Sequence, residues 1–130
     1  MSETHLPPGT SLDGGRYVVE RVLGEGGFGI TYLCQEPSLA RQVAIKEYFP
    51  LGGERSQGHL TAGRLGFEEV QSGLRRFEKE ARSLAGLDHP NIVRVAGLFE
   101  ERSTFYLVTE YVAGEVLASH HRDWLGPIVS

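Results

Sequence analysis

Much of the chain carries hydrophobic residues spaced as in β-strands. Three such runs, rich in β-branched and aromatic residues, cover residues 16–23, 30–35 and 41–49. Two more, at residues 92–100 and 104–112, are separated by the tripeptide Glu-Arg-Ser, which predicts a hairpin. The pattern therefore predicts five strands.

Between the third and fourth runs the spacing becomes that of a helix. Apolar residues recur there at intervals of four and three, which predicts one buried stripe on a helix over residues 67–85, made of Val70, Leu74, Phe77, Ala81 and Leu84. Glu68 and Glu69 suit the positive end of this helix, and Gly86 suits its C-terminal stop. Three strands, a helix and two strands predict an α+β fold, in which one helix packs on a five-stranded antiparallel sheet.

Two segments rich in turn-forming residues are expected to lie outside this framework. Residues 1–15 contain three glycines and two prolines, which predicts a flexible segment that buries little. Residues 50–66 contain five glycines and few large apolar residues, which predicts a mobile loop.

Composition narrows the classes of protein to which the chain can belong. Its 130 residues, 40% of them hydrophobic, and its net charge of −4 suit one soluble domain and disfavour nucleic acid or an anionic membrane as partner. The single cysteine, Cys34, excludes an internal disulfide and fits a reducing compartment. Without a signal-peptide pattern, a membrane segment or a metal-ligand spacing, the cytoplasm is the expected location and no metal site is predicted.

The stretch GEGGFG, residues 24–29, raises the question of a bound nucleotide. The G-x-G-x-x-G pattern opens a helix in dinucleotide-binding units, whereas in protein kinases it joins two antiparallel strands. Residues 30–37 are β-rich and end in a proline, which leaves no room for a crossover helix. A dehydrogenase domain, with Glu47 near the place of its ribose-binding acid, stays a weak alternative. A glycine-rich hairpin without a ligand is another.

Lys46 adds a second signal, because it lies inside the apolar run Val-Ala-Ile-Lys. An ammonium group on a central strand is costly unless an anion compensates its charge. The order of four segments along the chain resembles the N-terminal lobe of bacterial eukaryotic-like Ser/Thr protein kinases. These segments are LGEGGFGITYLC, VAIK, RFEKEARSLAGLDHPNIVRV and FYLVTEYVAGEVL. This resemblance covers residues 16–117, with residues 1–15 before it and a divergent tail at residues 118–130.

The resemblance implies an ATP site. Lys46 would bind the α and β phosphates and be oriented by Glu80, although periodicity does not choose between Glu78 and Glu80. The glycines would let the backbone approach the phosphates, and Phe28 would shield them from water. The residues that the resemblance assigns to ATP are Leu23, Gly24, Glu25, Gly26, Gly27, Phe28, Gly29, Thr31, Ala44, Lys46, Thr109, Glu110 and Val112.

The adenine end of this implied site rests on the resemblance in the same way. Leu23, Thr31 and Ala44 would line the pocket, and Thr31 stands where the family usually has valine. Thr109 would be the gatekeeper at the rear of the pocket. Glu110 and Val112 would offer backbone hydrogen bonds to adenine.

The catalytic half of the family pattern is not found in this sequence. The triplet at residues 121–123 reads His-Arg-Asp, but Ile128 stands where the catalytic-loop Asn belongs, and neither D-F-G nor A-P-E occurs. The hypothesis is therefore an ATP-binding lobe, truncated and inactive by itself, whose Mg²⁺ ligands and kinase C-lobe would lie elsewhere. The alternative is a non-catalytic module that docks on another kinase. The protein substrate stays open.

Overall fold

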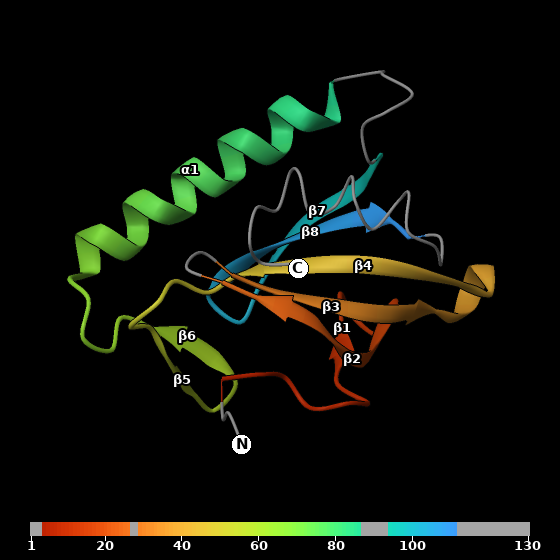
Figure 1. Cartoon of the computed structure of the whole chain (residues 1–130), viewed down its shortest axis with the longest axis horizontal. Helices are drawn as coiled ribbons and strands as arrows, with labels where there is room; N and C mark the ends of the chain where they lie inside the picture. The colour runs from red at the N-terminus through yellow and green to blue at the C-terminus, as the bar shows by residue number, and fades with distance from the viewer. Residues whose placement is uncertain (1–3, 27–28, 87–93, 112–130) are drawn as a thin grey trace.

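The structure, a computed structural model, describes residues 4–26, 29–86 and 94–111. A six-stranded antiparallel sheet, in the order β1-β2-β3-β4-β8-β7, forms its centre, and β5 and β6 form a separate hairpin (Figure 1). The elements are β1 (Ser11–Leu12), β2 (Tyr17–Glu25), β3 (Gly29–Glu36), a 3₁₀ helix (Pro37–Leu39), β4 (Arg41–Tyr48), β5 (Glu54–Ser56), β6 (His59–Thr61), α1 (Phe67–Ala85), β7 (Val95–Glu101) and β8 (Thr104–Glu110). The five predicted strands are β2, β3, β4, β7 and β8, so the predicted α+β fold is confirmed.

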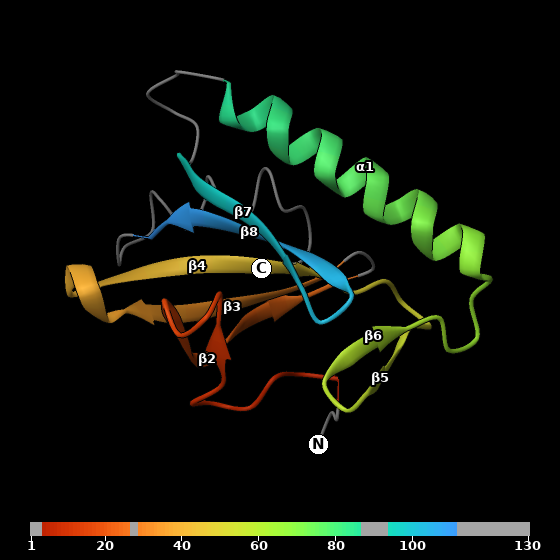
Figure 2. The ribbon, with the colours of Figure 1, turned by 180° about the vertical axis from the view of Figure 1, so that it is seen from behind.

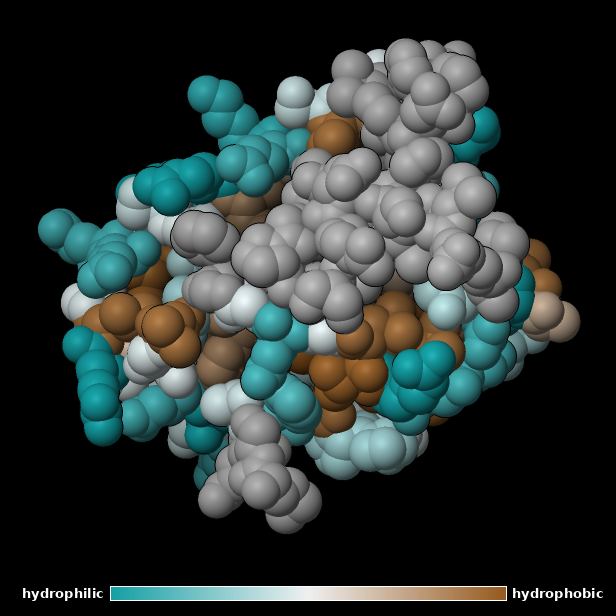
Figure 3. All heavy atoms as spheres, in the orientation of Figure 1, coloured by the Kyte–Doolittle hydropathy of each residue, from teal (hydrophilic) through white to brown (hydrophobic). Residues whose placement is uncertain are grey.

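Helix α1 has the bounds that its apolar spacing predicts. Val70, Leu74, Phe77 and Ala81 are buried, and Leu84 is half-buried. Glu68 and Glu69 occupy the first turn, and Gly86 is the C-cap. Hydrophilic side chains lie along the outer side of α1 in Figure 3, as expected of an amphipathic helix. The predicted hairpin joins β7 to β8 through Arg102 and Ser103, which both have positive φ angles, as a tight two-residue turn requires.

The expectation that residues 1–15 bury little is wrong. Leu12 is fully buried in the added strand β1, and Leu6 is 3% exposed. The backbone N–H of Leu6 donates to the hydroxyl of Tyr32 at 3.1 Å. Isolated leucines among prolines and glycines show no period, so the sequence pattern did not reveal that they complete the core.

The expectation of a mobile loop at residues 50–66 is also wrong for its central part. Residues 54–61 form the hairpin β5–β6, and Leu60 is buried against the core. In Figures 1 and 2, α1 and this hairpin lie on opposite sides of the main sheet. The glycines serve the turns around the hairpin, since Gly52, Gly58 and Gly63 have positive φ angles.

A buried ion pair fastens this hairpin to the sheet. Glu47 on β4 is fully buried, and both of its carboxylate oxygens accept hydrogen bonds from the guanidinium of Arg55 on β5, at 2.8 and 2.9 Å. The hydroxyls of Tyr32 and Tyr106 donate to the same carboxylate at 2.9 and 2.7 Å. Burial and the neighbouring Glu47 charge raise the pKa of both tyrosines. The carboxylate thus receives four donors from three strands, which compensates for its loss of water.

We expect Arg55→Met to lower the free energy of unfolding by about 3–5 kcal/mol, because it leaves the Glu47 charge buried with only neutral donors. Urea denaturation of the 130-residue chain measures the change. The control is Arg82→Met, which removes the exposed ion pair with Glu78 (2.7 Å) and should cost no more than about 0.5 kcal/mol. Equal decreases in the free energy of unfolding of the two variants would show that the buried Glu47–Arg55 pair does not stabilise the hairpin on the sheet.

Candidate functional site

Lys46 lies on a central strand with neighbours on both sides. It is opposite Thr31 on β3 and Leu107 on β8. Burial lowers the pKa of its ammonium group from the usual 10.5 to about 8, while the charge of Glu80 acts in the opposite direction. The Lys46 Nζ also lies 5.9 Å from the centre of the Phe77 ring on α1. The lysine side chain therefore points toward the helix.

The structure separates the two helix glutamates that periodicity leaves equivalent. Glu78 accepts two hydrogen bonds from Arg82, at 2.7 and 3.1 Å. Glu80 is exposed, and it is the carboxylate whose charge raises the pKa of Lys46. The role of Glu80 as the partner of Lys46, which the family resemblance implies, stays a prediction.

Other predicted site residues occupy adjacent rows across the sheet. Gly24, Thr31 and Lys46 are successive partners on β2, β3 and β4. Two residues along β4, Ala44 is opposite Thr109 on β8, whose hydroxyl donates to the Ala44 carbonyl at 3.4 Å. Because residues two apart on a strand face the same side, Ala44 and Lys46 share one face of the sheet.

Thr31 contributes a buried polar atom to this face. Its side chain is 1% exposed, and its Oγ1 has no hydrogen-bond partner among the residues that the structure describes. A buried hydroxyl without a partner costs about 1–3 kcal/mol. Thr31 is thus a polar group that a ligand on this face could satisfy.

The glycine-rich loop joins β2 to β3, as the sequence predicts for a kinase-type loop. The N–H of Gly26 donates to the carbonyl of Gly29 at 3.0 Å. A Cβ at Gly29 would lie 2.5 Å from the Glu47 carbonyl oxygen and 3.3 Å from the Lys46 Cε. Gly29 is therefore required by the close approach of β4, a reason additional to room for phosphates. Gly27 and Phe28 lie outside the described residues, as does Val112.

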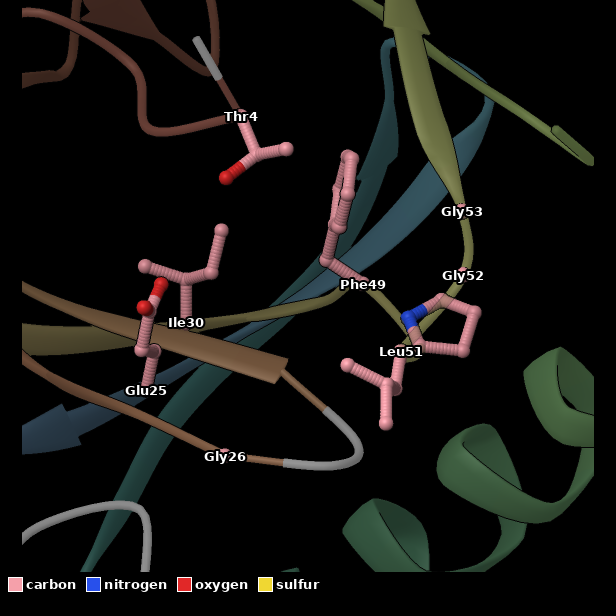
Figure 4. A pocket seen from close by; sticks show the side chains of 9 residues that line it. Thr4, Glu25, Gly26, Ile30, Phe49, Leu51, Gly52 and Gly53 are labelled. Carbon is pink, nitrogen blue, oxygen red and sulfur yellow. The ribbon is translucent and has the colours of Figure 1, made fainter. Parts of the chain in front are cut away.

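Glu25 is not brought to the same face. Its register partner is Ile30, which alternates with Thr31, and its carboxylate contacts the His5 ring. Glu25 borders a pocket of about 350 Å³, in which Ile30 and Phe49 lie on opposite sides with Leu51 at the edge (Figure 4). Neither Lys46 nor Glu80 lines this pocket. Leu23, also on β2, is half-buried.

The ribose role considered for Glu47 is excluded by its burial. The carboxylate is saturated by Arg55 and two tyrosines on the opposite face from Lys46. In a dinucleotide-binding unit a helix would follow the glycines, whereas here the glycines are followed by strand β3, which pairs directly with β4. The dehydrogenase alternative is therefore wrong.

Sequence reasoning missed the contacts of two helix residues near Lys46. Phe77 was predicted only as a core residue, yet its ring lies below the Lys46 ammonium and 5.8 Å from the Tyr48 ring. Gly73 was not singled out, although an isolated glycine inside a helical pattern signals a close packing contact. A Cβ at Gly73 would overlap the Tyr48 hydroxyl.

Comparisons with known proteins identify the family. The protein kinase domain family matches residues 17–125. The serine/threonine-protein kinase PrkC of Bacillus subtilis is 38% identical over 106 residues, which cover 82% of this chain and 14% of PrkC. PksC of Streptomyces coelicolor is 38% identical over 115 residues, covering 85% of this chain and 18% of PksC.

Solved kinase structures have the same fold. The apo form of PpkA-294 superposes with a TM-score of 0.78 and 34% identity, over 86% of this chain and 40% of that one. The Mycobacterium tuberculosis PknI kinase domain gives a TM-score of 0.57 and 25% identity, over 97% and 43%. The fold and these structural neighbours define a protein kinase N-terminal lobe. The chain belongs to the protein kinase domain family, among the eukaryotic-like kinases of bacteria, and it spans less than a fifth of the two curated relatives.

We expect Lys46→Met to stabilise the unliganded chain at neutral pH, by up to about 3 kcal/mol, because it removes a charge that burial disfavours. Since the folded-state pKa of about 8 lies below the usual 10.5, the unfolded chain binds more protons between these values. Lys46 therefore lowers the free energy of unfolding below pH 8, and this effect disappears as the pH rises toward 10.5. Urea denaturation at neutral pH and near pH 10 measures this difference between variant and parent.

Lys79→Met is the matched control for this experiment, since Lys79 is the other lysine of the chain and is exposed. It should leave the pH dependence of stability unchanged. A Lys46→Met difference that stays constant with pH would contradict the lowered pKa.

Gly29→Ala is expected to destabilise the chain by about 1–3 kcal/mol, since its Cβ has no space beside β4. Gly66→Ala, where a Cβ meets nothing within 4 Å, is the control and should have a smaller effect. Thermal or urea unfolding compares them. Equal effects would rule out the close approach as the reason for Gly29.

Proposed function

We propose that this chain is the ATP-binding lobe of a bacterial Ser/Thr protein kinase, in which Lys46 binds phosphate and Glu80 orients it. The observation that carries the proposal is the position of Lys46: a half-buried ammonium on central strand β4, beside a glycine-rich turn and near a helix carboxylate. Such an ammonium gains most from a multiply charged anion, because the anion offsets the cost of its burial. The α and β phosphates of ATP supply that charge.

The adenine end would lie along the same face of the sheet. Ala44 and its partner Thr109 lie two residues from Lys46 along β4, a distance of about 7 Å, and on the same face. Their small side chains leave room for a flat ring. The N–H of Glu110 already donates to the Arg94 carbonyl at 3.0 Å, so a bond from the Glu110 backbone to adenine would use its carbonyl oxygen. Beside the phosphate end, the Thr31 hydroxyl is a second candidate contact.

Phosphoryl transfer itself is proposed for the complete family member. ATP supplies the transferred γ-phosphoryl group, and in this lobe Lys46 would hold and neutralise the phosphates behind it. Within residues 4–26, 29–86 and 94–111, no three histidine, cysteine or carboxylate side chains gather as a metal site. We therefore assign Mg²⁺ to no described residue. Nor is any described helix long and apolar enough to cross a bilayer.

We expect ATP to bind the 130-residue chain, and its affinity to fall as the pH rises through about 8, because Lys46 loses its charge there. Bound phosphate raises the pKa of Lys46, so the fall extends to somewhat higher pH. Calorimetric titration at several pH values measures the affinity. Lys46→Arg should retain binding without this pH dependence, and Lys46→Met should weaken binding by about tenfold or more.

Two glutamate variants test the helix partner. Glu80→Gln should weaken ATP binding, whereas Glu78→Gln, which changes a carboxylate paired with Arg82, should not. Equal effects of these two variants would overturn the assignment of Glu80. An ATP affinity that Lys46→Met leaves unchanged would overturn the site, and absence of binding would favour the non-catalytic docking module.

A further inference from the structure

Helix α1 approaches β4 closely at one point, where a tyrosine occupies the space of a missing side chain. A Cβ built on Gly73 would overlap the Tyr48 hydroxyl and lie 2.6 Å from the Tyr48 Cζ. Real Cβ atoms do not approach other atoms so closely, so any larger residue at position 73 forces the helix or the tyrosine to move. Glycine also weakens a helix interior relative to alanine, so its presence here opposes helix propensity.

Tyr48 is held firmly at this point. It is 5% exposed, and its backbone carbonyl accepts a 2.7 Å hydrogen bond from the buried hydroxyl of Thr104. Its ring lies 5.8 Å from the ring of Phe77, at an interplanar angle of 56°. A side chain fixed on both its backbone and its ring is a rigid contact for the helix.

The same two elements carry the proposed phosphate-binding pair. Lys46 and Tyr48 are two residues apart on β4 and therefore face the same side. On α1, Gly73, Phe77 and Glu80 are spaced by four and three residues, which places them on one stripe that extends over about 10 Å. Tyr48 thus meets the helix two turns before Glu80, and Phe77, between these points, contacts both Tyr48 and Lys46.

We propose that Tyr48 and Gly73 are positioning residues: the tyrosine seated against the glycine fixes the distance of α1 from β4 and thereby places Glu80 against Lys46. The inference rests on the proposed function for the use of this pair, but the placement itself can be measured without a nucleotide. Leu74 and Val70 beside this contact are buried core residues, and α1 also packs against β7 and β8, so the Tyr48–Gly73 contact adds to a helix that the core already holds.

The test is the pKa of Lys46, read by NMR of labelled lysine side chains in the unliganded 130-residue chain. Lys79 is the other lysine and serves as the internal reference. Gly73→Ala should push α1 away from β4, so the favourable charge of Glu80 weakens and the pKa of Lys46 falls below its parent value. ATP affinity, where it is measurable, should fall in parallel.

A double variant shows whether Tyr48 causes the effect. In Gly73→Ala/Tyr48→Leu the ring that meets the new Cβ is gone, so the pKa of Lys46 should return toward the value in Tyr48→Leu. Ser72→Ala, at an exposed neighbouring position, should leave the pKa unchanged. An unaltered pKa in Gly73→Ala, or effects of the two substitutions that simply add, would overturn the proposal.

Folding provides a second readout if Gly73→Ala does not yield a folded chain. In that case, a double variant that folds supports the proposed contact, and one that stays unfolded overturns it. Because the pKa is measured without ATP, a chain that binds no ATP would refute the proposed function but leave this result interpretable.

Discussion

Strand β4 carries two adjacent ionisable residues that the fold buries on opposite faces, and the rest of the structure depends on this constraint. Lys46 faces helix α1, and Glu47 faces the hairpin β5–β6. Each charge has lost much of its water and needs a partner from another part of the chain. Glu47 finds Arg55 and two tyrosine hydroxyls, whereas the opposing charge for Lys46 comes from Glu80 on an exposed position of α1.

Burial affects the two charges differently. Glu47 has four donors at 2.7–2.9 Å and no exposure, so its side of the sheet is closed. Lys46 retains a lowered pKa of about 8, which means that burial outweighs the compensation by Glu80. A bound anion would therefore stabilise the charged form of Lys46 further. The fully bonded Glu47 carboxylate therefore suits a structural role, and the Lys46 ammonium, whose charge burial disfavours, suits a binding role.

Helix α1 packs against β7 and β8 and also reaches β4. Phe77 and Gly73 meet Tyr48, and Phe77 also meets Lys46, so one stripe of the helix contacts β4 at these residues. Buried Val70, Leu74 and Ala81 supply the hydrophobic area that holds the helix. The tight approach at Gly73 adds a geometric limit that apolar area by itself does not provide.

Local periodicity determined much of this protein from its sequence. The interval of its apolar residues placed α1 over residues 67–85, apolar runs rich in β-branched and aromatic residues placed the five main strands, and the polar tripeptide at residues 101–103 placed the hairpin. Burial of Leu6 and Leu12 and the Glu47–Arg55 pair follow from contacts between separate segments, and no local spacing encodes them. Only the tertiary structure decided these contacts, because the partner of a buried charge or of a core side chain is the residue that the fold brings next to it in space.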